Sequence, residues 1–227
     1  MKLLSTLVLL FAATASMALP VEAGGTKTLR KLGLKAYWSV LDDDQKTEAK
    51  KIGEKFLLET AADRLAVEAR VMKFRADVTA LLSVEQRRTA AKVFATLKKL
   101  DGERKKELFS KLLDRTDRAV LSERVDRISG ASPPEQVELG LAIHDQLFEA
   151  YLGALAEKLA LTADQQAAAR ALYDGLKADL KPTALRLAEE KSAAVRAALA
   201  LLRPEQKEKL DSFREDLMGK VLDFLRG

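Results

Sequence analysis

The sequence has no cysteine and one histidine, and it is poor in aromatic residues, glycine and proline. The absence of cysteine excludes disulfides, cysteine-ligated zinc, iron–sulfur clusters and thiol catalysis. A single histidine leaves little basis for a histidine-based metal site. The 11 glycines and 5 prolines among 227 residues provide few turns, whereas a β-sandwich or barrel needs a turn every ~8–12 residues. The composition therefore favours a protein built from long helices.

The first 23 residues have the pattern of a secretory signal peptide. Lys2 precedes an apolar run over Leu3–Ala13, and small residues close two candidate cleavage sites, after Ala18 or after Ala23. The run is shorter than the ~20 apolar residues of a membrane span. An uncleaved anchor or a buried N-terminal helix is the alternative. We expect an exported protein, periplasmic in a bacterium.

The two halves of the remaining chain differ in charge. Residues 24–130 carry 25 Lys and Arg against 17 Asp and Glu, a net +8. Residues 131–227 carry 13 against 16, a net −3. A basic half can attract unfolded acidic chains, anionic lipid or other polyanions. We do not expect nucleic acid as a partner, because export removes the protein from it and aromatic residues for base stacking are scarce.

A leucine followed four residues later by glutamine recurs along the chain. The four copies are Leu41–Gln45 (LDDDQ), Leu82–Gln86 (LSVEQ), Leu161–Gln165 (LTADQ) and Leu202–Gln206 (LRPEQ). The first two leucines are 41 residues apart, and so are the last two. This equal spacing indicates an internal duplication, with one unit over 24–130 and the other over 131–227.

Apolar residues recur at the same distances after each leucine. The residues 8 positions after the leucine are Ala49, Ala90, Ala169 and Leu210. Those 11 positions after it are Ile52, Val93, Leu172 and Phe213, and those 15 positions after it are Phe56, Leu97, Leu176 and Leu217. These offsets have the i, i+3, i+7 spacing of the buried stripe of an amphipathic helix. Each motif is therefore predicted to begin a helix.

The residue types within the motif explain how it begins a helix. Ser83 with Gln86, and Thr162 with Gln165, match the capping box, in which a hydroxyl accepts from the N3 amide and the glutamine returns to the N-cap amide. Asp42 can cap the first copy in the same way. We interpret the motif residues as structural caps, since each cap contributes only ~1 kcal/mol and none carries a reactive group.

The whole chain is predicted to be all-α, with long antiparallel helical hairpins in an elongated or cradle-like shape. The expected helices cover 26–38, 44–81, 85–99, 102–129, 133–159 with Ser132 as its cap, 163–201 and 204–225. The fourth motif has a defective cap, Arg203, which Pro204 at the first helical position partly compensates. Pro182 is expected to kink the sixth of these helices or end it near Leu180.

The motifs resemble those of a known family. Leu161–Gln165 is a full LTxxQ motif, and Leu82–Gln86 differs from it only by serine for threonine. Together with the signal peptide and the basic helical composition, they resemble the LTxxQ-motif periplasmic proteins of the Spy and CpxP type. That resemblance implies cradle-shaped antiparallel dimers and chaperone activity without ATP. Four copies in one chain resemble two such units in tandem, so that one chain imitates the dimer; self-association stays open.

The leading hypothesis is a periplasmic, ATP-independent chaperone or envelope-stress protein that binds unfolded or aggregation-prone polypeptides. The candidate client-binding residues form the basic cluster around the Asp101–Gly102 turn: Lys98, Lys99, Arg104, Lys105 and Lys106. The alternative is an amphipathic-helix protein that binds lipid or a membrane surface.

No catalytic residues, cofactor or metal are predicted. Glu189 and Glu190 are adjacent on a helix and point about 100° apart, so they form no acid/base pair. His144 is expected to be half-exposed on its helix, and Met72 and Met218 are too far apart in sequence for a methionine-rich copper site.

Overall fold

The computed structural model describes residues 35–128 and 130–226, apart from the side chain of Lys98. Within these residues the chain forms helices and turns and no strand, so the predicted all-α class is confirmed. After a short helical stretch at 35–40, the helices are α3 (Asp43–Glu59), α4 (Ala61–Ala80), α5 (Val84–Lys99), α6 (Gly102–Leu113), α7 (Arg118–Ile128), α8 (Pro133–Leu159), α9 (Ala163–Ala200) and α10 (Pro204–Arg226). The predicted signal peptide and the first part of the expected 26–38 helix lie outside the described residues.

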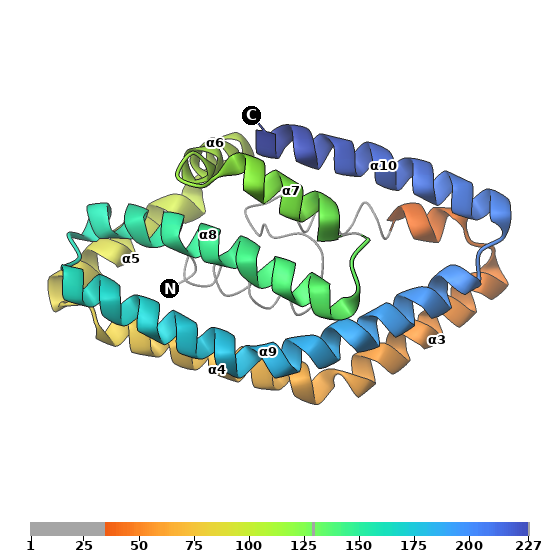
Figure 1. Ribbon diagram of the computed structural model, residues 1–227, viewed down its shortest axis with the longest axis horizontal. Coiled ribbons are helices and arrows are strands. Elements are labelled where there is room, and N and C mark those ends of the chain that lie inside the picture. Colours follow the sequence, from red (N-terminus) through yellow and green to blue (C-terminus); the bar gives the residue numbers. More distant parts are fainter. Residues whose placement is uncertain (1–34, 129, 227) are drawn as a thin grey trace.

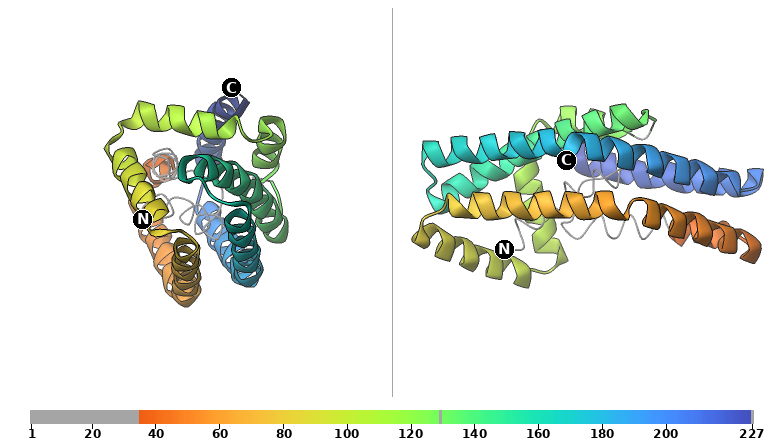
Figure 2. Two further views of the ribbon diagram at one scale, coloured as in Figure 1. Left: turned by 90° about the vertical axis from the view of Figure 1, so that its left-hand side faces the viewer. Right: turned by 90° about the horizontal axis from the view of Figure 1, so that it is seen from below.

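The long axis of the molecule is formed by two long helical segments that lie side by side (Figures 1 and 2). One is α3 with α4, and the other is α9. They run antiparallel: Asp63 of α4 pairs with Arg186 of α9 at N–O distances of 2.6 and 3.2 Å, whereas Arg70, further along α4, donates to Thr183, which comes earlier in α9. The partner of α3–α4 is thus a helix from the other half of the chain, not its neighbour in sequence.

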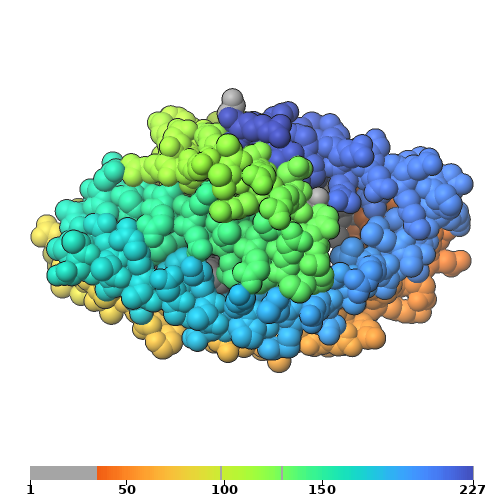
Figure 3. Space-filling model, viewed as in Figure 1, coloured from red at the N-terminus to blue at the C-terminus, as the bar shows by residue number. Residues whose placement is uncertain are grey.

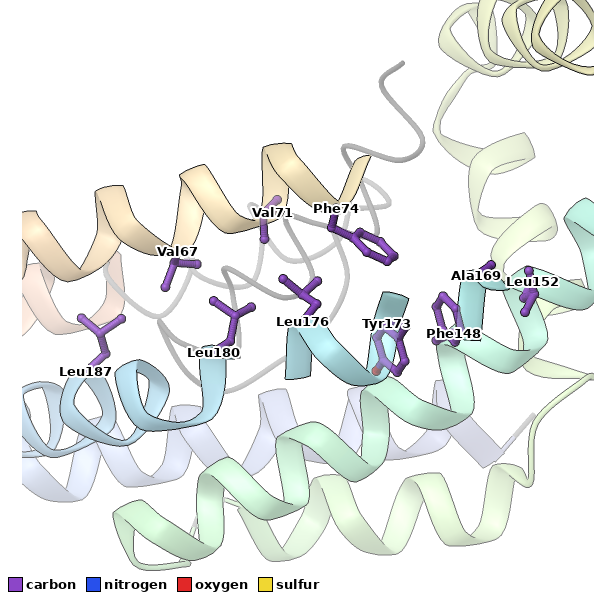
Figure 4. Close-up of a cluster of buried hydrophobic side chains, with 10 residues drawn as sticks. All are labelled: Val67, Val71, Phe74, Phe148, Leu152, Ala169, Tyr173, Leu176, Leu180 and Leu187. Atoms are coloured by element: carbon purple, nitrogen blue, oxygen red, sulfur yellow. The ribbon is translucent and has the colours of Figure 1, made fainter. Parts of the chain in front are cut away.

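The remaining helices pack on this pair. α8 forms an antiparallel hairpin with α9, α7 lies along α8, and α10 packs against α7 (Figure 1). The largest buried cluster joins both halves of the chain: Val67, Val71 and Phe74 of α4 point toward Leu176, Leu180 and Leu187 of α9 (Figure 4). The two predicted units, 24–130 and 131–227, therefore share one core.

The residues of the predicted stripe are buried or half-buried at all twelve positions. The alanines at offset eight (Ala49, Ala90 and Ala169) are each at most 7% exposed. The 3.6-residue period thus identified the inward faces correctly, because burial of apolar area is what holds such helices in place.

Two of the expected helices are interrupted. The helix expected over 44–81 breaks at Thr60, whose hydroxyl donates to the Phe56 carbonyl at 2.7 Å; such back-bonding bends helices. The helix expected over 102–129 divides into α6 and α7. There Asp117 accepts from the Val120 amide at 3.1 Å and so starts α7 anew.

Two further local expectations were only partly right. α9 does not end near Leu180 but continues through Pro182 to Ala200, and its ribbon changes direction about midway along its length (Figure 1), which leaves a kink as the alternative that fits. Pro182 is exposed while Thr183 and Ala184 beside it are buried, so packing outweighs the one hydrogen bond that proline cannot make. Ser132 precedes α8 as predicted, but its side chain makes no capping hydrogen bond; prolines occupy the first turn instead.

Candidate functional site

The second and third Leu-x-x-x-Gln motifs meet at one end of the long helix pair. Gln86 and Gln165 each close their own capping box, as predicted, with Ser83 and Thr162. The two glutamine side chains also bond each other: Gln86 Nε2 donates to Gln165 Oε1 at 3.0 Å, and Gln165 Nε2 donates to Gln86 Oε1 at 2.9 Å. The motifs are therefore joined across 79 residues of sequence.

Each amide in this pair uses all of its hydrogen-bonding groups. The second N–H of Gln86 reaches the carbonyl of Ala160 at 3.2 Å, and that of Gln165 reaches the carbonyl of Leu81 at 2.7 Å. Each Oε1 also accepts from the N-cap amide of its own helix. Each glutamine therefore caps two helix ends: the start of its own helix and the end of the helix that precedes its partner motif. Helix termini otherwise leave these backbone groups unpaired.

The first and fourth motifs form an equivalent pair at the opposite end. Gln45 and Gln206 exchange amide hydrogen bonds of 3.0 and 2.9 Å, and their second N–H groups donate to the carbonyls of Leu201 and Val40. Asp42 completes the predicted capping box with Gln45. We refer to the Gln86–Gln165 and Gln45–Gln206 arrangements as the two glutamine clamps.

The defective fourth cap acquires a different role. Arg203 offers no side-chain acceptor, yet its amide still donates to Gln206 Oε1 at 2.8 Å. Its guanidinium instead pairs with the Asp42 carboxylate at 2.6 Å. The predicted cap is thus absent, and Arg203 binds across the clamp instead.

The predicted basic cluster lies where α5 ends and α6 begins. Its described members are Lys99, Arg104, Lys105 and Lys106, of which only Lys105 is half-buried and the others are exposed. Asp101 caps α6 by accepting from the Arg104 amide at 2.9 Å, and its carboxylate lies 3.9 Å from the Arg104 guanidinium. No other carboxylate of residues 35–128 and 130–226 lies within ion-pair distance of these four cations.

Apolar side chains border the cluster. Lys106 Nζ lies 5.8 Å from the ring centre of Phe224, which stacks on Phe109 at 6.2 Å. Leu108, the residue before Phe109, is 42% exposed. The end of α10 therefore meets α6 at one edge of the molecule, visible where the two meet in Figure 3. Cations and apolar groups share this edge. We call it the α6 edge, and it comprises Lys99, Arg104, Lys105, Lys106, Leu108, Phe109 and Phe224.

The histidine lies in the interior instead of on a half-exposed face, whereas the adjacent Asp145 is half-buried. His144 is 1% exposed because α7 and α9 cover α8 from different sides. Next to it, Asp145 accepts from the Tyr173 hydroxyl at 3.1 Å and from Lys177 at 2.8 Å. Burial and the Asp145 charge raise the pKa of Tyr173, and its ring stacks on Phe148 at 3.9 Å. Tyr173 and Phe148 belong to the core, and the partly exposed Asp145 and Lys177 join α8 to α9 at its boundary.

Burial of tyrosine predicts a loss of stability in alkali. Burial also raises the pKa of Tyr151, so the folded state holds its phenolic protons more tightly than the unfolded state. The tyrosine contribution to the free energy of unfolding should therefore be constant below pH ~10 and fall above it. Urea titrations at stepwise higher pH measure this decline. Tyr151→Phe should make it shallower; an unchanged slope would exclude Tyr151 as a source.

The described residues contain no group of three or more His, Asp or Glu that could hold a metal ion. Among the same residues, no helix is both long and apolar enough to cross a membrane. Compared with models of protein families, with curated proteins and with solved structures, the chain shows no match.

Proposed function

We propose that this protein is a periplasmic, ATP-independent chaperone or envelope-stress protein that binds unfolded or aggregation-prone polypeptides. The observation that carries the proposal is the α6 edge. There, mostly exposed cations with one carboxylate contact, at 3.9 Å, lie near exposed and half-buried apolar side chains. Unfolded chains expose both charge and apolar groups, so an edge of this kind offers long-range attraction followed by weak apolar contact.

The clamps support the assignment to the LTxxQ type. The motif that suggested the resemblance joins helix ends from two halves of the chain, and the segments 43–80 and 163–200 between the motifs are equal in length. Such an arrangement is what two units in tandem need if one chain is to take the place of a dimer. On this proposal the clamps hold the framework, and client binding falls to the α6 edge.

The test is suppression of aggregation without nucleotide. A chemically denatured client is diluted into buffer with and without the protein, and light scattering is recorded. We expect scattering to fall as the protein approaches the client concentration. Unchanged scattering at a stoichiometric ratio would contradict the proposal. Flotation with anionic vesicles at physiological salt tests the lipid-binding alternative, and we expect the protein to stay at the bottom of the gradient.

A further inference from the structure

The outer face of α3 and α4 carries an apolar stripe that no described helix covers. Leu58, Leu65 and Met72 are 78%, 67% and 50% exposed. Between and after them stand exposed alanines at 62, 69 and 76. Val67 points from α4 toward α9 (Figure 4), and Leu65, two residues earlier on the same helix, is turned about 200° away from it. The stripe therefore lies opposite the core face.

The spacing of the stripe is that of a coiled-coil seam. Its six positions follow one another at intervals of 4, 3, 4, 3 and 4 residues over 58–76, which is the a/d pattern of a heptad repeat. The break at Thr60 hardly interrupts it, because the amides of Thr60 and Arg64 keep i→i−4 bonds of 3.1 and 3.0 Å. The seam is about 27 Å long at 1.5 Å per residue.

The fold itself does not require this seam. In the second half of the chain, the positions 120 residues later are Ala178, Pro182, Leu185, Glu189, Ser192 and Arg196. These positions lie on α9, the helix that corresponds to α3–α4 in the second half of the chain, and they include two charged residues, a serine and a proline. If the stripe only served packing within the chain, both halves would need it. An exposed heptad in one half alone indicates a partner helix.

We propose that the seam binds a second copy of this chain, with the two α3–α4 segments antiparallel. In that register Leu58 faces Ala76, Ala62 faces Met72, and Leu65 faces Ala69 of the other copy. Every layer then joins one large side chain to one alanine, so the helices can approach evenly. A parallel pairing would alternate alanine layers with leucine or methionine layers and leave gaps.

The charges beside the seam complement this register. Glu59 and Lys73 occupy e positions, and e faces e in an antiparallel pair, so each Glu59 meets the Lys73 of the other copy. Both side chains are exposed, and their ion pairs within the chain are the surface contacts Lys55–Glu59 and Lys73–Asp77. Glu68, at the centre of the seam, faces Glu68 of the other copy. This contact between like charges weakens the association, so removing the charge should strengthen it.

Sedimentation velocity of protein expressed from the full-length sequence tests the proposal over about 1–100 µM. We expect a dimer whose dissociation constant rises by about 100-fold in Leu65→Glu, because two carboxylates would enter the centre of the seam. Val195→Glu is the matched control: Val195 is 44% exposed on α9, away from the seam. Circular dichroism checks that both variants keep the wild-type helix content.

Charge exchange identifies the register. Lys73→Glu should weaken association about tenfold at low salt, and adding Glu59→Lys should restore it. Glu68→Gln should tighten it. A wild-type protein that stays monomeric throughout the concentration range would overturn the proposal, as would a dimer indifferent to Leu65→Glu. So would failure of the charge exchange to rescue. The readout is mass in solution, so the outcome does not depend on the proposed chaperone activity.

Discussion

Replacing both Gln86 and Gln165 by alanine lowers the free energy of unfolding by about 3 kcal/mol in our expectation. Each glutamine contributes a cap to its own helix and hydrogen bonds to its partner motif, so each single substitution should cost about 2 kcal/mol. The first substitution already removes the bonds between the two amides. The second therefore costs less, and a coupling of about 1 kcal/mol should appear in the double-mutant cycle.

Urea unfolding followed by circular dichroism measures this cycle. Gln166 supplies the control, because it is the next residue along α9 and its amide donates to the carbonyl of Leu161 at 3.1 Å. Gln166→Ala should cost well below 1 kcal/mol, because the side chain joins no second motif. Additive losses for Gln86→Ala and Gln165→Ala would show that the clamp bonds do not act as a unit. Unchanged client binding in the single variants would separate the clamps from the α6 edge.

Reversing three cations of the α6 edge should slow client capture by about tenfold or more at low salt. The variant Lys99→Glu, Arg104→Glu, Lys106→Glu changes exposed side chains only, so the fold should persist. Attraction over distances beyond a few ångströms is screened by salt, and the Debye length falls from ~10 Å at 0.1 M to ~3 Å at 1 M. The rate difference should therefore shrink as salt increases.

Stopped-flow fluorescence with an acidic, permanently unfolded client measures the capture rate. The control reverses Lys50, Lys51 and Lys55, which are exposed on α3 at the other end of the molecule (Figure 1). Both variants change net charge equally, so only the location differs. If both slow capture by the same factor, the overall charge of the protein attracts the client and the α6 edge has no special role.

Some of the candidate site could be predicted because its causes are local. A capping box depends on two residues three positions apart, so the boxes Ser83–Gln86 and Thr162–Gln165 can be predicted without knowledge of the fold. The basic cluster is likewise a run of neighbouring residues. What sequence reasoning missed is that the motifs bond in pairs. The signal was present in the equal 41-residue spacings, because two segments of one length laid antiparallel bring their ends together.

Other features depended on contacts between distant residues. His144 and Leu58 stand on helices that look amphipathic in sequence, yet one is buried and the other is 78% exposed. The difference arises because α8 has neighbours on more than one side, whereas α3 has its main partner on one. Periodicity finds an apolar face but does not tell which helix covers it, or whether any does.

The scarcity of aromatic, glycine and proline residues indicated the all-α class from the sequence alone. The caps and Pro204 determined where most helices begin, because these signals act within one turn. Only the tertiary structure decided that α3–α4 pairs with α9, that Pro182 stays within a helix and that the four motifs form two clamps. Those outcomes depend on contacts between residues 79 or more positions apart, where packing outweighs local preference.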